Sequence, residues 1–237
     1  EIAQCLVGSE MCIRDSSDIS HQLKTPLSAL MMYQEIIENE PENFETVKEF
    51  SLKIGTALKR MEQLIQSMLK ITRIDAGSIS FEKSNYSIPN IINHAISELT
   101  TRADNEKKEI VIDGDLEQML YCDIEWTGEA IGNIIKNALD HTDTGGKISI
   151  SWEQTPAMIR IFITDNGHGI SQEDIHHIFK RFYRSKNTSE SQGIGLGLPL
   201  AKAIVEGQGG ILSVQSELLQ GCLLYTSPSP RDTERSR

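Results

Sequence analysis

Apolar residues recur three or four positions apart over residues 17–40, which is the spacing of an amphipathic helix. The sequence Pro41-Glu42-Asn43 interrupts this pattern, which then resumes at Phe44 and continues for about nine turns. It stops at Ala76-Gly77, a typical C-terminal signal. The first third of the chain is therefore predicted to be a hairpin of two helices, the second one long.

A hairpin of two amphipathic helices cannot bury its whole apolar stripe by itself. Association with a second copy would complete a four-helix bundle, and the heptad-like length of the second helix favours this dimer. The alternative is that the stripe packs on another domain of the same chain.

The remainder of the chain mixes both periodicities. Residues 81–88 have strand character, and Pro89 opens a helix over residues 90–103, at a position where proline is tolerated. Four strands are predicted over residues 109–113, 118–121, 147–152 and 158–164, and the last two form a hairpin. Further helices are predicted over residues 124–141, 171–179 and 195–206, and a final strand over residues 211–214. The fold class is α+β: a helical hairpin followed by an α/β sandwich with a mixed sheet.

Composition limits the possible partners. The formal net charge of −11 argues against a nucleic-acid partner, since phosphate backbones require clustered Lys and Arg. No apolar run approaches the roughly 20 residues needed to cross a bilayer, and we expect this chain to be soluble and cytoplasmic. The four cysteines show no metal-ligand spacing and no dense disulfide pattern.

Both ends of the chain lack the patterning of the interior. Residues 1–15 and 221–237 resemble translated sequencing adapter, and we interpret them as non-native segments without function. The alternative is an ordinary disordered tail. We expect no closing strand after Gly221, which would leave a neighbouring strand edge exposed and favour aggregation. Residues 186–192 lack apolar anchors and are predicted to be a mobile loop.

His21 is the first candidate for chemistry. It lies among polar residues of the first helix, so its ring should face solvent. An exposed helical histidine is usually only a surface residue, but Pro26 removes a backbone hydrogen bond nearby and suggests a site. With a reference pKa of about 6.5, a neutral imidazole could attack a phosphoryl group near pH 7.5.

Two glycine-rich segments are candidates for nucleotide binding: residues 165–170, Asp-Asn-Gly-His-Gly-Ile, and residues 193–198, Gly-Ile-Gly-Leu-Gly-Leu. Glycines let backbone approach phosphates, and the second segment opens a helix. Neither segment fits a dinucleotide fold or a P-loop. Asn133 and Asn137 lie four apart on one helix and could hold Mg²⁺ bridging phosphates, although surface polarity alone also explains them.

With these segments, the chain resembles the catalytic half of a two-component sensor histidine kinase over residues 17–221. Residues 20–27, Ser-His-Gln-Leu-Lys-Thr-Pro-Leu, are similar to the phosphoacceptor box of that family. Residues 133–138 are similar to its asparagine box and residues 178–184 to its phenylalanine box. The two glycine segments match its glycine boxes, so five motifs stand in the family's order. The resemblance divides the chain into a dimerisation and phosphotransfer hairpin, residues 16–78, and an ATP-binding domain, residues 79–220.

The resemblance implies a role for each matching residue. Asp165 would accept a hydrogen bond from the adenine amino group, His141 would border the adenine, and Asn137 would ligate Mg²⁺. Asn133 lies where water-hydrolysing relatives carry a glutamate base, so transfer is favoured over hydrolysis. The remaining predicted contacts to ATP and its lid are Gly167, Gly169, Ile170, Phe182, Arg184, Gly193, Gly195, Leu196 and Gly197. The γ-phosphoryl group would pass from ATP to His21 and then to an aspartate of a response regulator.

Two residues, Gln22 and Asp140, depart from the family pattern, whereas Thr25 matches it. Gln22 replaces an acidic residue that could take the second ring proton of His21, and we expect slower autophosphorylation as a result. Thr25 is at the position that would orient water for dephosphorylation of the regulator, so phosphatase activity is an open alternative. Asp140 stands where many relatives have a lysine near the phosphates.

Two other functions remain open. The chain is either a different ATPase or kinase with the same nucleotide fold, or a dimeric scaffold that binds ATP without transferring phosphate. The first class lacks the helical segment around His21, and the second would show no acid-labile phosphate. By resemblance, the parent protein would carry a membrane sensor upstream of residue 17.

Overall fold

A computed structural model gives the three-dimensional structure and describes residues 2–156, 158–185, 193–217 and 220–228. The chain forms two compact units, Glu1–Met68 and Leu69–Arg237. Among the described residues, none of the helices combines the length and hydropathy that a bilayer crossing requires. The loop predicted over residues 186–192 lies outside the described residues.

The first unit is a helical hairpin, as predicted. Helix α1 spans Ile2–Asn39, and α2 spans Phe44–Asp75, with its last turns in the second unit. Asn43 starts α2, because its side-chain oxygen accepts a hydrogen bond from the N–H of Thr46 at 3.2 Å. Near the turn, the rings of Tyr33 and Phe50 pack with centroids 5.5 Å apart.

The predicted start of the first helix was wrong, because α1 begins at Ile2 and not at residue 17. Residues 2–16 contain no proline and one glycine, Gly8, so nothing in this segment stops a helix. Residues 2–16 lack an amphipathic pattern of side chains, but a helical backbone can form without one.

Several large apolar side chains of the described part of the hairpin are exposed. The exposed large apolar side chains include Leu27, Met31, Leu52, Leu58 and Ile65. They recur along both helices, as expected for a hairpin whose apolar stripe has a partner outside the chain.

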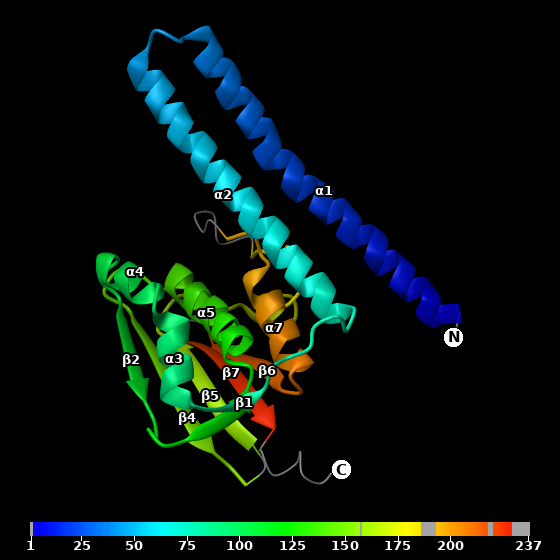
Figure 1. Ribbon diagram of the computed structural model, residues 1–237, viewed down its shortest axis with the longest axis vertical. Helices are drawn as coiled ribbons and strands as arrows, with labels where there is room; N and C mark the ends of the chain where they lie inside the picture. The colour runs from blue at the N-terminus through cyan, green and yellow to red at the C-terminus, as the bar shows by residue number, and fades with distance from the viewer. Residues whose placement is uncertain (1, 157, 186–192, 218–219, 229–237) are drawn as a thin grey trace. The chain divides into compact units, whose positions relative to one another are not determined.

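The second unit is an α/β sandwich built on a mixed sheet (Figure 1). Its strands are β2 (Glu109–Asp113), β4 (Lys147–Gln154), β5 (Met158–Asp165), β6 (Ile211–Glu217) and β7 (Gln220–Pro228). They lie in the order β2-β4-β5-β7-β6, in which only the β2–β4 pair is parallel. A second small sheet pairs β1 (Ser84–Ser87) with β3 (Met119–Cys122), antiparallel.

A layer of helices covers one face of the large sheet (Figure 1). Helix α5 (Ile124–His141) contacts α3 (Ile88–Ile96), α7 (Gly197–Gly207), β4 and β5. The strands β4 and β5 alternate buried and less buried residues, which matches their predicted period of two. The core lies between this sheet face and α5, whose buried apolar residues are Ala130, Ile131, Ile134, Ile135, Ala138 and Leu139.

Two predicted helices differ from the structure, one by being divided and the other by being shorter. The helix predicted over residues 90–103 is divided into α3 and α4 (Leu99–Asn105), separated at Ser97 and Glu98. The Ser97 hydroxyl donates to the carbonyl of His94 at 3.0 Å, a local bond that competes with helix continuation. The helix predicted over residues 171–179 is the single turn α6 (Gln172–Ile175).

The expectation of a missing final strand was wrong. Residues 220–228 form β7, which pairs with β5 on one side and β6 on the other. The segment Leu223-Leu224-Tyr225-Thr226 has the apolar, aromatic and β-branched residues that favour strands, and both neighbouring strands offer an open edge. The predicted exposed edge beside this position is therefore absent.

A buried polar cluster holds the end of α7 against the rest of the unit. Gln208 follows α7 and is 8% exposed. Its side-chain oxygen accepts from the N–H of Asp123 at 2.8 Å, and its amide donates to the Thr127 hydroxyl at 3.0 Å. The ammonium of Lys83 donates to the backbone carbonyl of Gln208 at 2.7 Å. These bonds fix α7 relative to the start of α5.

Candidate functional site

The predicted nucleotide residues come from α5, from the loop after β5 and from the start of α7, all in the second unit. The prediction of a helix over residues 124–141 is confirmed to the residue. Its buried side chains face the sheet, whereas Asn133 and Asn137 are half-buried on a different face. An amide at each position therefore lies near the surface without being fully solvated.

The start of α7 lies close to Asn133. A Cβ placed on Gly197 would lie 3.4 Å from the side-chain oxygen of Asn133. The first amides of a helix have no partner within it and favour phosphate oxygens. The structure thus places the start of the second glycine segment's helix close to the asparagine segment.

Asp165 ends β5 and is half-buried. Its Oδ1 accepts the N–H of Gly167 at 2.9 Å, and no donor among the described residues approaches its Oδ2. Burial raises the pKa of this carboxyl, while the Gly167 bond and His141 oppose that change. One carboxylate oxygen is fixed by the loop, and the other is available to an amino group.

The glycine loop docks on the end of α5. A Cβ on Gly167 would lie 2.1 Å from the carbonyl oxygen of His141, so only glycine fits here. The same carbonyl accepts the N–H of His168 at 3.2 Å. Burial is also the largest influence on the imidazole of His141 and lowers its pKa, which favours the neutral ring. His141 and Asp165 therefore lie at one site.

The far end of this loop is fixed by a residue that the sequence analysis missed. Gly169 has a positive φ of 70°, and the N–H of Ile170 donates to the hydroxyl of Ser216 at 2.8 Å. Ser216 is 7% exposed and lies on β6. No local motif marks this serine, because its role depends on the sheet order.

The phenylalanine segment and the second glycine segment are joined through their backbones. The N–H of Phe182 donates to the carbonyl of Gly195 at 2.9 Å, and both residues have positive φ, 62° and 76°. A Cβ on Gly195 would lie 2.8 Å from the carbonyl oxygen of Tyr183. Leu196, 2% exposed, is buried beside this junction, whereas Arg184 is exposed.

Asp174 holds the other side of the phenylalanine segment. Its carboxylate accepts hydrogen bonds from the hydroxyl of Tyr183 and, at 2.7 Å, from that of Ser185. The bond from Tyr183 is the largest influence that lowers the pKa of Asp174. The Ser171 hydroxyl accepts the N–H of Asp174 at 3.1 Å, a local cap, whereas the contact of Asp174 with Tyr183 joins residues nine positions apart.

The predicted phosphoacceptor residues lie in the first unit, on α1. His21 is exposed, as predicted, and Gln22 is half-buried. Helix α1 continues through Pro26, which cannot donate the bond that the carbonyl of Gln22 would normally receive. The Thr25 hydroxyl donates to the carbonyl of His21 at 3.1 Å.

Comparison with known proteins identifies both units. Residues 16–77 match the family model of the His Kinase A (phospho-acceptor) domain, and residues 122–231 match that of the histidine kinase-, DNA gyrase B- and HSP90-like ATPase. The chain belongs to the two-component sensor histidine kinases.

Curated members of this family align along most of the chain. The sensor protein kinase PmrB of Pseudomonas aeruginosa is 29% identical over 193 residues, which cover 81% of this chain and 40% of PmrB. The sensor-like histidine kinase SenX3 of Mycobacterium tuberculosis is 28% identical and covers 85% of this chain and 50% of its own length. The chain thus spans half or less of the length of these relatives.

Solved kinase structures share the fold. The Acinetobacter baumannii histidine kinase AdeS has a TM-score of 0.73 and 19% identity, covering 89% of this chain and 98% of its own. The histidine kinase ThkA, solved in complex with the response regulator protein TrrA, has a TM-score of 0.75 and 18% identity. The match covers 97% of this chain and 64% of the ThkA chain. The ATPase family match also makes ATP the nucleotide of the second unit.

Proposed function

We propose that this chain is the catalytic core of a sensor histidine kinase that phosphorylates its own His21 with ATP and passes the phosphoryl group to an aspartate of a response regulator. The observation that carries this proposal is an exposed histidine five residues before Pro26, in a chain whose second unit places Gly197 near Asn133 and Gly167 near His141 and Asp165. In the transfer, a ring nitrogen of His21 attacks the γ-phosphorus, the bond to the ADP oxygen breaks, and the other ring nitrogen loses its proton.

The residues of the second unit supply binding and positioning. The Oδ2 of Asp165 would accept the adenine amino group, with His141 bordering the ring. Asn133 and the amides at the start of α7 would lie along the phosphates, and Gly167, Gly169 and Ile170 would shape the loop beside the base. Catalysis of this kind rests on positioning and on neutralising charge.

Mg²⁺ fits the donors present. Asn137 offers a neutral amide oxygen, and hard cations accept such an oxygen together with phosphate oxygens and water. Among the described residues, no three His, Cys, Asp or Glu side chains form a metal cluster, so the ion would be held jointly by Asn137 and the nucleotide. When bound, it would neutralise charge on the phosphates.

The lid over the nucleotide, which the second glycine segment would shape, would couple nucleotide binding to the contact of protein side chains with the phosphates. Phe182 and Gly195 share a backbone hydrogen bond at positive φ, so movement of one segment displaces the other. Gly193 and Leu196 lie on the same glycine segment, and Arg184 would reach the phosphates from the phenylalanine segment. Tyr183 and Asp174 would limit this movement.

The partners follow from the first unit. A homodimer through the exposed apolar residues of α1 and α2 would form a four-helix bundle, and a receiver domain would bind beside His21. Thr25 would support phosphatase activity toward the regulator, with Gln22 setting its strength. We place this part of the protein in the cytoplasm, with a membrane sensor upstream in the parent protein.

Incubation with γ-labelled ATP and Mg²⁺ tests the proposal. We expect an acid-labile label that His21→Ala abolishes and that His94→Ala, a matched change at another partly exposed histidine, retains. Label that survives His21→Ala would indicate a different kinase with this fold. ATP binding without any label would indicate the dimeric scaffold.

Gln22 makes a further prediction about rate. A carboxylate at this position can take the proton that leaves His21, whereas glutamine cannot. Gln22→Glu should therefore speed autophosphorylation, with the larger gain at lower pH within the range 6 to 9, where hydroxide is scarce. Equal rates for both proteins over this range would contradict the argument.

A further inference from the structure

Asp140 places a negative charge on the helix face that carries the two asparagines. Residues four and seven positions apart on a helix share one face, so Asn133, Asn137 and Asp140 follow one another along α5. If phosphates lie along this face, as proposed above, an uncompensated carboxylate there would repel them.

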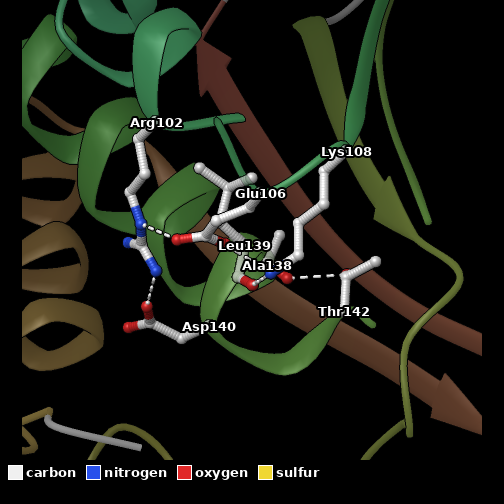
Figure 2. A network of polar contacts seen from close by, with 7 residues as sticks. All are labelled: Arg102, Glu106, Lys108, Ala138, Leu139, Asp140 and Thr142. Carbon is white, nitrogen blue, oxygen red and sulfur yellow. Dashed lines mark hydrogen bonds and ion pairs between the residues drawn. The ribbon is translucent and has the colours of Figure 1, made fainter. Parts of the chain in front are cut away.

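The structure shows how this charge is compensated. The Nη2 of Arg102, on α4, donates to Oδ1 of Asp140 at 2.6 Å (Figure 2). The side chains of Arg102 and Asp140 are 33% and 23% exposed, so the pair is partly removed from solvent screening. The cation beside α5 thus comes from a different helix.

Two further residues fix the guanidinium in place. The Nε of Arg102 donates to Glu106 at 2.7 Å, and the other carboxylate oxygen of Glu106 accepts from Lys108 at 2.5 Å. Lys108 also donates to the carbonyl of Leu139 at 2.7 Å and is 9% exposed (Figure 2). Because Leu139 and Asp140 are adjacent in α5, both ends of the network contact this helix.

The network is balanced in charge. It contains two cations, Arg102 and Lys108, and two carboxylates, Glu106 and Asp140. Lys108 also satisfies a carbonyl at the end of α5, where a cation is favoured by the helix dipole. Removal of Arg102 alone would leave one negative charge on the face with Asn133 and Asn137.

We propose that Arg102 is a positioning residue for nucleotide binding: it neutralises Asp140 and so keeps the phosphate side of α5 free of net negative charge. The inference rests on the proposed ATP site and adds a residue outside all the motifs. It also explains how a carboxylate is tolerated where, by resemblance, many relatives have a lysine.

The test compares the affinities of adenosine, ADP and ATP, each measured with Mg²⁺ by calorimetry at low ionic strength. Arg102→Gln should weaken ATP binding about fivefold, the effect of one uncompensated charge near phosphates across water. Adenosine should bind unchanged, ADP should show an intermediate loss, and added salt should reduce the difference. Arg73→Gln, which removes an exposed cation from the same unit, should change none of the three.

A second variant separates charge from folding. Asp140→Asn removes the charge that Arg102 compensates, so the double variant Arg102→Gln, Asp140→Asn should bind ATP within about twofold of the parent chain. Equal losses for adenosine and ATP, or a double variant as weak as Arg102→Gln, would overturn the inference. So would an unchanged ATP affinity of Arg102→Gln. Failure of the parent chain to bind ATP would instead overturn the proposed function itself.

Discussion

The junction between the phenylalanine segment and the second glycine segment predicts that Gly195→Ala destabilises the second unit for two separable reasons. Gly195 has φ of 76°, and an alanine Cβ there would lie 2.8 Å from the carbonyl oxygen of Tyr183. Two other glycines isolate these effects. Gly145 has φ of 82° with no atom within 4 Å of the added Cβ, and Gly167 has an added Cβ 2.1 Å from the His141 carbonyl oxygen but no positive φ.

The magnitudes follow from these contacts. A left-handed conformation costs an L-residue about 1–2 kcal/mol, partly offset by about 0.4–1 kcal/mol from the less flexible unfolded chain. Gly145→Ala should therefore lower the free energy of unfolding by about 1 kcal/mol. Overpacking costs about 1–3 kcal/mol, so Gly167→Ala should cost about 2 kcal/mol and Gly195→Ala, which combines both effects, about 3 kcal/mol.

Urea unfolding followed by tryptophan fluorescence is the assay, because both tryptophans, Trp126 and Trp152, belong to the second unit. Gly167→Ala and Gly195→Ala should also weaken ATP binding, whereas Gly145→Ala should not. If Gly195→Ala costs no more than Gly145→Ala, the close approach to Tyr183 does not constrain this segment and the reasoning fails.

Three further predictions concern buried groups. Gln208→Leu should lower the free energy of unfolding by about 2–4 kcal/mol, because the N–H of Asp123 and the Thr127 hydroxyl lose their partner. The control in the same urea titration is Gln154→Leu, at an exposed glutamine of the same unit, and equal midpoints would contradict this. Burial raises the pKa of the Cys122 thiol to about 11, so its alkylation in the folded protein, followed by mass spectrometry, should stay slow at pH 8.5 and become fast in urea; fast alkylation without urea would refute it. Burial lowers the pKa of His141 in the folded protein. As the pH falls below the unfolded value of about 6.5, the unfolded chain therefore binds more protons than the folded chain, and the free energy of unfolding decreases. His141→Gln should lose less stability than the parent between pH 7 and 5.5, and identical slopes would count against a buried neutral imidazole.

The sequence predicted those elements whose formation depends on local pattern. The helix over residues 124–141 and the strand over residues 109–113 have their predicted bounds, because their periodicity and the cap residue Asp123 are local signals. The glycine and asparagine segments were also recognisable locally, since glycine is required wherever backbone approaches another group.

Features that depend on distant partners were not predictable in this way. Ser216 matters because β6 lies near the loop that ends at Ile170, and Arg102 matters because α4 lies beside the end of α5. Neither residue has a neighbour in sequence that suggests its role. Strand β7 also lies in a segment of foreign appearance, but strand formation over residues 220–228 depends on the strand propensity of these residues and not on their origin.

The place of β7 in the sheet has a consequence for synthesis of the protein on the ribosome. Strand β7 is made after β6, and it is the only described strand with which β6 pairs. While residues 220–228 remain in the exit tunnel, β5 and β6 each lack a neighbour, so the nucleotide unit cannot complete its sheet. The α1–α2 hairpin, made first and stabilised by local contacts, can form during this delay. The second unit, and not the hairpin, is therefore the part of the chain whose folding waits for its last strand.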